Sequence, residues 1–333
     1  MSDPRNLVYE PDPRGLAEAR ERVSTYYSKK GARVPPERIF FTSGTSEAYA
    51  HLFRLLCDPE ERVLAPRPSY PLLAYLAGLN DVRLGHYRLL YEFDEWRIGP
   101  EIEIGLDETT RAVITVQPNN PTGNFSPDRD RDILAGICEA TGKALISDEV
   151  FLDYAWDGAG RPSLAADGRV LTFALGGISK LLGLPQMKLG WIAVSGPGPL
   201  VEDACRRLEM IADTFLSVST PAQRAFLSWM DGYEALTGPI LERVKANRLR
   251  LKEALDGAEG LRLLAAEGGW YGVVELQTGA GEDKALALLE QDRVLVQPAY
   301  FYDFDRDNGF VVSLLPEPVV FAEALGRILS RVW

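Results

Sequence analysis

The sequence predicts an α/β protein with a mainly parallel sheet flanked by helices, followed by a smaller α+β region. Short apolar runs alternate with stretches whose apolar residues recur every three or four positions. The chain has 333 residues, of which 46% are hydrophobic, enough for a large core and two domains. Turn-forming and polar residues follow directly after several of the apolar runs, as in open α/β sheets that bind ligands.

The expected strands are short and rich in β-branched or aromatic residues. They cover residues 38–42, 62–65, 111–117, 144–147, 170–175 and 191–194. Helical periodicity is clearest over residues 47–57 and 128–141, and the run Gly196-Pro-Gly-Pro199 precedes a further helix. A long helix is predicted over residues 236–256, and we expect it to connect two domains. The large domain would comprise residues 1–240 and the small domain residues 241–333.

Composition narrows the class of protein. The 48 acidic residues exceed the 36 basic ones, and this net charge of −12 argues against nucleic acid as a partner. No apolar stretch approaches the ~20 residues of a membrane span, and the N-terminus lacks the apolar region of a signal peptide. Three widely spaced cysteines suit reduced thiols in the cytoplasm. The two histidines, His51 and His86, lack partners at ligand spacing, so we expect no metal site.

Four polar segments are expected to meet at one edge of the sheet. Gly44, Asn120, Asp148 and Lys180 each follow a predicted strand, and ligands of open α/β sheets bind outside the carboxyl ends of the strands. Lys180 lies among small residues, where partial burial would lower its pKa and free the amine for a Schiff base. Taken alone, a lysine in such a sequence is more often a solvated surface residue.

The segment around Gly44 suggests a phosphate site. Gly44, Thr45 and Ser46 link a strand to a helix, where free backbone N–H groups and the positive helix end favour an anion. An ordinary helix cap, with Ser43 or Thr45 followed by Glu47, explains the same residues about as well.

These segments, in this order and at these spacings, resemble the class I/II aminotransferases, pyridoxal-phosphate enzymes of fold type I. The resemblance rests on residues 42–48, 119–123, 147–150 and 175–191, and it extends from about Tyr9 to the C-terminus. It implies that pyridoxal 5′-phosphate is the cofactor and that Lys180 holds it as a Schiff base. It further implies that Asp148 faces the pyridine nitrogen, Asn120 donates to the ring O3′, and Tyr70 stacks on the ring.

The resemblance also implies a set of phosphate contacts. Gly44, Thr45 and Ser46 would hold the phosphate, with Lys188 at a position where the family usually has arginine. Ser179, beside Lys180, is a further candidate phosphate or positioning ligand, although the family more often has its serine three positions before the lysine, where this chain has Gly177. Tyr9 resembles the tyrosine that reaches the neighbouring subunit's phosphate, and it therefore implies a homodimer with shared sites.

Three departures from the family pattern bear on catalysis and substrate binding. Phe151 stands where the family usually has a tyrosine that donates to O3′. The arginine that grips the substrate carboxylate is replaced by Val311 or Val312. The arm ahead of Tyr9 is shorter than usual, which predicts a reduced substrate lid.

The sequence therefore predicts an aminotransferase acting between an amino acid, preferably hydrophobic or aromatic, and a 2-oxo acid. A lyase or cyclase on the same fold and a non-catalytic paralogue remain alternatives, because the motifs chiefly bind cofactor. A cofactor-binding module of a transcription regulator is disfavoured, since the sequence offers no basic DNA-binding extension.

Overall fold

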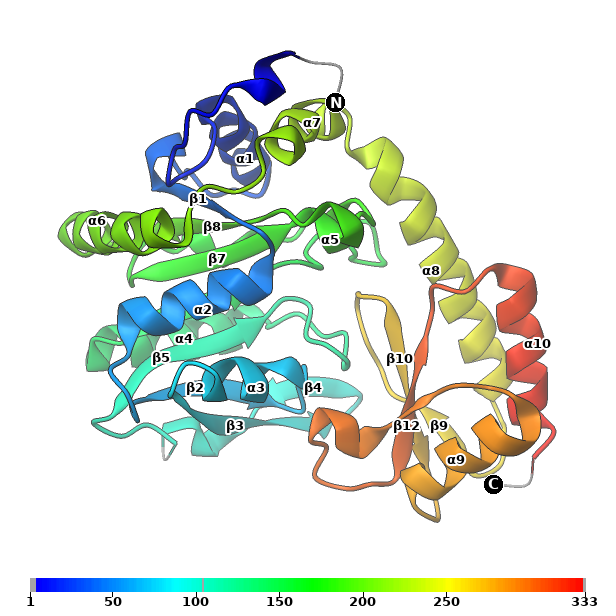
Figure 1. Cartoon of the computed structure of the whole chain (residues 1–333). Helices are drawn as coiled ribbons and strands as arrows, with labels where there is room; N and C mark the ends of the chain where they lie inside the picture. The colour runs from blue at the N-terminus through cyan, green and yellow to red at the C-terminus, as the bar shows by residue number, and fades with distance from the viewer. Residues whose placement is uncertain (1–3, 104, 332–333) are drawn as a thin grey trace.

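The chain folds around two sheets in a computed structural model that describes residues 4–103 and 105–331 (Figure 1). Within that described part the larger sheet has eight strands, in the spatial order β1-β8-β7-β6-β5-β2-β3-β4. These strands are β1 (Ile39–Thr42), β2 (Arg62–Arg67), β3 (Arg83–Glu92), β4 (Glu95–Ile98), β5 (Thr110–Val116), β6 (Ala144–Asp148), β7 (Thr172–Gly177) and β8 (Gly190–Ser195). Strands β3, β2, β5, β6 and β7 run parallel.

The predicted mainly parallel sheet is confirmed, with antiparallel strands near both edges. Strand β8 runs antiparallel to β1 and β7, and β4 runs antiparallel to β3. The hairpin of β3 and β4 was not predicted, because most of the β3 side chains are exposed or only partly buried and the strand lacks the expected apolar run. The other strands lie within a few residues of their predicted positions.

Helices cover both faces of the larger sheet (Figure 1). Alternate residues of β1 show the division: Phe40 packs with α2 (Thr45–Leu56), α3 (Leu72–Gly78) and α6 (Gly198–Phe215), whereas Ile39 and Phe41 pack with α1 (Ala17–Lys29) and α7 (Thr220–Met230). Helix α4 (Asp128–Thr141) adds Leu134 and Cys138 to the latter face of the sheet. The chain therefore forms three layers, helix, sheet and helix.

A second, antiparallel sheet lies beside the first, in the order β11-β12-β10-β9. Its strands are β9 (Leu261–Leu263), β10 (Tyr271–Leu276), β11 (Gln297–Pro298) and β12 (Gly309–Ser313). One face packs against α8 (Glu234–Leu255), α9 (Gly281–Asp292) and α10 (Pro318–Leu329). Helix α8 spans the distance between the two sheets in Figure 1, and the predicted domain division at residues 240/241 falls inside it. That division stays a prediction.

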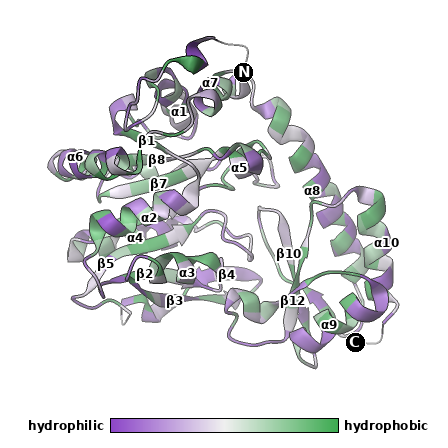
Figure 2. Ribbon diagram, in the orientation of Figure 1, coloured by the Kyte–Doolittle hydropathy of each residue, from purple (hydrophilic) through white to green (hydrophobic). Residues whose placement is uncertain are grey.

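Figure 2 shows hydrophobic and hydrophilic residues on both α6 and α8, as expected for helices that bury one side only. No helix of the described residues is sufficiently long and apolar to cross a bilayer.

Backbone hydrogen bonds, among other contacts, join loops of the larger sheet to the region of the second sheet. The backbone N–H groups of Glu267 and Gly268, in the turn before β10, both donate to the carbonyl of Gly123 at 2.9 Å. On the other side, the N–H of Ser69 donates to the carbonyl of Tyr302 at 3.0 Å. The first contact requires glycine, because a Cβ on Gly123 would lie 2.6 Å from the Gly268 carbonyl oxygen, and Gly123 has a φ of 71°.

Candidate active site

A cavity lies at the carboxyl ends of the parallel strands, where several predicted site residues meet. Its lining comprises Gly44, Thr45, Tyr70, Val116, Asn120, Asp148, Val150, Phe151, Gly177, Ser179, Lys180, Leu189 and Tyr271. Tyr70 follows β2, Asn120 follows β5, Asp148 ends β6 and Lys180 lies in the short helix α5 (Ile178–Leu181) after β7. Residues far apart in sequence thus face one space because their parallel strands end at the same edge of the sheet.

Three predicted phosphate ligands are not among the residues that line this cavity. Ser46 is exposed in the first turn of α2, and Lys188 is exposed just before β8. Tyr9 is 82% exposed in the N-terminal segment. Their roles as phosphate ligands stay predictions.

The carboxylate of Asp148 is the charged group that burial affects most in this cavity. It accepts hydrogen bonds from the Tyr49 hydroxyl at 3.0 Å and from the Val150 N–H at 3.2 Å. Burial nevertheless raises the pKa of Asp148 to about 6, against the opposing effects of the two hydrogen bonds and of Lys180. The site thus holds a carboxylate that would gain from a cationic partner.

Lys180 is partly buried against aromatic rings. Its Nζ lies 5.4 Å from the ring centroid of Trp270 and 5.8 Å from that of Phe151. Burial lowers the pKa of Lys180, and the negative charge of Asp148 opposes that effect. The Tyr154 hydroxyl donates to the Lys180 carbonyl at 2.8 Å and so fixes the backbone of α5. A lysine placed this way can present a neutral amine more readily than a surface lysine.

The loop after β5 holds Asn120 in a fixed position. Its neighbour Asn119 donates through Nδ2 to the Pro68 carbonyl at 3.0 Å and to the Thr122 hydroxyl at 2.8 Å. Asn120 itself is 7% exposed, and its Oδ1 has no hydrogen-bond partner within residues 4–103 and 105–331. A buried amide oxygen without a partner in a cavity is the mark of a polar ligand site.

Glycines bring three backbone segments close together beside the helix end. A Cβ on Gly190 would lie 3.0 Å from the Cα of Gly44, and a Cβ on Gly177 would lie 3.2 Å from the Leu189 carbonyl oxygen. No side chain caps α2 at Gly44, and Glu47 instead accepts from the Ser43 N–H at 2.6 Å. Glu47 thus supplies one half of a cap pattern, as the ordinary-cap interpretation expects, but within the described residues no side chain accepts from the first N–H groups of α2, which stay available to an anion.

The comparison with protein families decides the identity of this arrangement. The model of the family "Aminotransferase class I and II" matches residues 2–311. The chain belongs to the class I and II aminotransferase family. Enzymes of this family and fold depend on pyridoxal phosphate, and the predicted resemblance is confirmed.

Curated relatives in this family span most of the chain. The glutamate-pyruvate aminotransferase AlaA of Escherichia coli is 26% identical over 92% of this chain and 78% of its own length. The alanine aminotransferase of Mycobacterium tuberculosis is 25% identical over 95% of this chain and 76% of its own length. Both are aminotransferases, and this chain is an enzyme of the same class.

Solved structures confirm the fold. The alanine aminotransferase of Pyrococcus furiosus superposes with a TM-score of 0.90 at 23% identity, covering 97% of this chain and 83% of the other. The tyrosine aminotransferase of Leishmania infantum gives a TM-score of 0.89 at 21% identity, covering 97% and 82%. At such identities the likeness establishes the fold type I architecture alone.

The residues present fit the family's cofactor. Within the described residues, the Asp148 carboxylate has no cationic partner at bonding distance, and Gly44 begins a helix without a side-chain cap. The Asn120 side chain makes no hydrogen bond there, so its Nδ2 can donate. Lys180 lies at the same cavity. These are the donors and acceptors that a pyridinium, a phenolic oxygen, a phosphate and an aldehyde require.

The departures from the family pattern have clear positions in the structure. Phe151 is 3% exposed and lines the cavity without a hydroxyl. The hydroxyl of nearby Tyr154 is already used on the Lys180 carbonyl. Val311 and Val312 are both buried, at 2% and 6% exposure, and neither lines the cavity.

Sequence reasoning missed several residues of the site. Tyr49, which donates to Asp148, lies on the buried face of α2, one turn after Thr45. No local sequence signal indicates this contact, because the two residues are 99 positions apart. Val116, Val150 and Leu189 line the cavity as ordinary apolar residues, and no sequence signal separates them from core positions.

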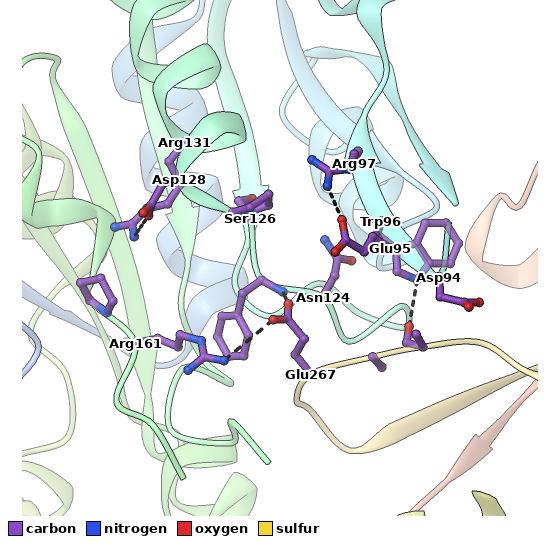
Figure 3. Close-up of a pocket in the computed structure, with 15 residues that line it drawn as sticks. Asp94, Glu95, Trp96, Arg97, Asn124, Ser126, Asp128, Arg131, Arg161 and Glu267 are labelled. Carbon is purple, nitrogen blue, oxygen red and sulfur yellow. Dashed lines mark hydrogen bonds and ion pairs between the residues drawn. The ribbon is translucent and has the colours of Figure 1, made fainter. Parts of the chain in front are cut away.

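A second hollow, of about 710 Å³, lies between β4, the loop after Asn124 and the turn before β10 (Figure 3). Its charged side chains satisfy one another: Arg97 pairs with Glu95, and Arg131 with Asp128 at 3.6 Å. Arg161 lies 3.8 Å from Glu267, which also accepts from the Phe125 N–H at 2.9 Å. The first two pairs each lie within one element, β4 and α4, whereas Glu267 links the turn before β10 to Arg161 and to the Phe125 backbone.

Replacing Asp148 by asparagine should make the cofactor-free protein more stable at about pH 8, by roughly 1–3 kcal/mol. The folded-state pKa of about 6 exceeds the ordinary value of 3.8, so the folded protein binds more protons and loses stability as pH rises between these values. Urea unfolding of the apoprotein at several pH values measures the effect. The exposed Asp81→Asn is the control, and an unchanged pH dependence in Asp148→Asn would contradict the assignment.

Proposed function

We propose that the protein transfers an amino group between an amino acid with an apolar or aromatic side chain and a 2-oxo acid, with pyridoxal 5′-phosphate bound at Lys180. The observation that carries this proposal is the meeting of Lys180, Asp148 and Asn120 in one cavity of a class I and II aminotransferase. The curated relatives are named for alanine, glutamate and pyruvate, which supports amino acids and 2-oxo acids as the substrate classes.

The cofactor's parts would be held by different residues of the cavity. The uncapped end of α2 at Gly44 and Thr45 would bind the phosphate, assisted by Ser46, Ser179 and Lys188. Asp148 would pair with the pyridine nitrogen, and a cation there would relieve the cost of burying this carboxylate. Asn120 would bond the phenolic oxygen and Tyr70 would cover the ring.

Lys180 would act twice in the reaction. Its Nζ would first hold the cofactor aldehyde, and once free it would carry the proton that leaves the substrate α-carbon. The bound cofactor supplies an electron-withdrawing ring that stabilises negative charge at that carbon. The Trp270 and Phe151 rings beside Nζ exclude water, and burial keeps the pKa of the amine below its usual value, which favours its role as a base.

Borohydride reduction of the protein reconstituted with pyridoxal phosphate should fix the cofactor to the peptide that contains Lys180. Lys180→Ala should remove the visible absorbance of the bound cofactor and reduce turnover by several orders of magnitude. Peptide mass mapping measures the first result, and the exposed Lys252→Ala, which keeps both Lys180 and Lys188, is the control. Label on Lys188 in place of Lys180 would refute the assignment.

We propose that the enzyme works as a homodimer in the cytoplasm. Support for the dimer comes from the N-terminal segment, where Leu7, Val8 and Tyr9 are 88%, 58% and 82% exposed. Apolar side chains gathered on one segment mark a protein contact more often than a solvated surface. In such a dimer Tyr9 would reach the phosphate of the other subunit.

Sedimentation should therefore give a dimer at micromolar concentration. Tyr9→Phe should weaken cofactor binding about tenfold, because a hydrogen bond to a charged group contributes roughly 1.5 kcal/mol. The exposed Tyr75→Phe serves as the control. A monomer with full cofactor affinity would contradict the proposal.

A panel of amino donors tests the reaction and the substrate preference together. Alanine and phenylalanine should convert the bound cofactor to its amine form, and aspartate and glutamate should react more slowly, because the described lining of the cavity has Lys180 as its one cation. Absorbance change and 2-oxo acid release measure the outcome. Release of 2-oxo acid without cofactor conversion would instead indicate an elimination enzyme, and aspartate as the best donor would refute the apolar preference.

A further inference from the structure

The sheet register determines which valine stands on the cavity side of the second sheet. Val311 pairs with Val273, and Ser313 pairs with Tyr271, in the antiparallel ladder of β10 and β12. Directly opposed residues and residues two apart share one face of a sheet, so Tyr271, Val273, Val311 and Ser313 lie on the same face. Val312 pairs with Gly272 and belongs to the opposite, helix-covered face.

Val311 itself cannot bind a carboxylate. It is 2% exposed and packs in a cluster with Val273 and Tyr302, away from the cavity lining. The diagonal neighbour on the next strand, Tyr271, is the residue of this face that enters the cavity. The hydroxyl of Tyr271 therefore brings a polar group to the cavity from the strand next to Val311.

The hydroxyl of Tyr271 is available as a donor. Within residues 4–103 and 105–331 it makes no hydrogen bond, whereas the neighbouring Tyr302 hydroxyl donates to Gln297 and the Tyr300 hydroxyl to Glu282. Burial raises the pKa of Tyr271, and the proximity of Tyr70 raises it further, so the phenol keeps its proton at neutral pH. It is a neutral O–H group facing the cavity.

Tyr70, in the loop after β2, supplies a second phenol to the cavity. It lines the same cavity and is 38% exposed. Its pKa is also raised by burial and by Asp148, so it too remains a donor. Two phenols, one from the loop after β2 and one from β10, thus line the same cavity, whose described lining offers no guanidinium.

We propose that Tyr271, assisted by Tyr70, binds the substrate α-carboxylate through phenolic O–H donors that replace the missing arginine. The proposal rests on the proposed function, since it names the residues that would bind the carboxylate of the amino acid substrate. Hydrogen bonds from neutral donors to a carboxylate are strong in a partly buried site, but they add no positive charge. The cavity would therefore bind one carboxylate weakly and would gain nothing from a second.

The test compares a carboxylate with its uncharged counterpart in the holoenzyme. Isothermal titration of 3-phenylpropanoate and 3-phenylpropanol, which cannot react, should show preference for the carboxylate in the native protein. Tyr271→Phe should weaken 3-phenylpropanoate about tenfold, for the loss of roughly 1.4 kcal/mol, and leave 3-phenylpropanol unchanged. In kinetics, the KM for phenylalanine should rise by a similar factor with a smaller change in kcat.

The control is Tyr300→Phe, which removes a hydroxyl outside the cavity and should change neither ligand. Unchanged cofactor absorbance in Tyr271→Phe verifies that the site is intact. Equal weakening of both ligands, no weakening of the carboxylate, or failure of the native protein to prefer the carboxylate would overturn the assignment. Absence of transamination with every donor, alongside the expected binding pattern, would refute the proposed function and leave the role of Tyr271 standing.

Discussion

The burial of one carboxylate is the constraint on which the rest of the site depends. Asp148 ends a strand with buried neighbours on both faces, and it keeps its place through the Tyr49 hydroxyl and the Val150 N–H. Because those two donors do not fully offset burial, the pKa of Asp148 stays above its usual value. The folded chain thus carries the cost of this buried carboxylate in advance, and a cationic partner bound beside it would recover part of that cost, which is a form of preorganisation.

Much of this architecture was predictable from the sequence, because local patterns determine it. The helix over residues 128–141 was predicted to the residue, and Asp148 and Lys180 were expected at strand ends. The hairpin of β3 and β4 was not predictable, since an exposed strand has no apolar run to reveal it. The partnership of Tyr49 with Asp148 was equally hidden, because it joins residues 99 positions apart.

The register of β10 and β12 distinguishes the two valines that the sequence offers at the position of the family's carboxylate-binding arginine. Val311 and Val312 are chemically identical neighbours, so only strand pairing determines which one lies on the cavity side. The same pairing brings Tyr271 beside that position from another strand. The cavity wall beside Val311 therefore still has a polar group. That group is the Tyr271 hydroxyl, which comes from β10 and not from β12.

The backbone hydrogen bonds between the regions of the two sheets have a consequence for ligand binding. The Gly123 carbonyl holds the turn before β10, and the Ser69 N–H holds the Tyr302 backbone, so swinging one sheet away from the other would break backbone hydrogen bonds. An incoming molecule would meet walls that are already in position and would spend little conformational entropy on ordering them. The shape of a preformed cavity would then determine selectivity. Substitution of single lining side chains could change the preferred ligand without a change in the backbone.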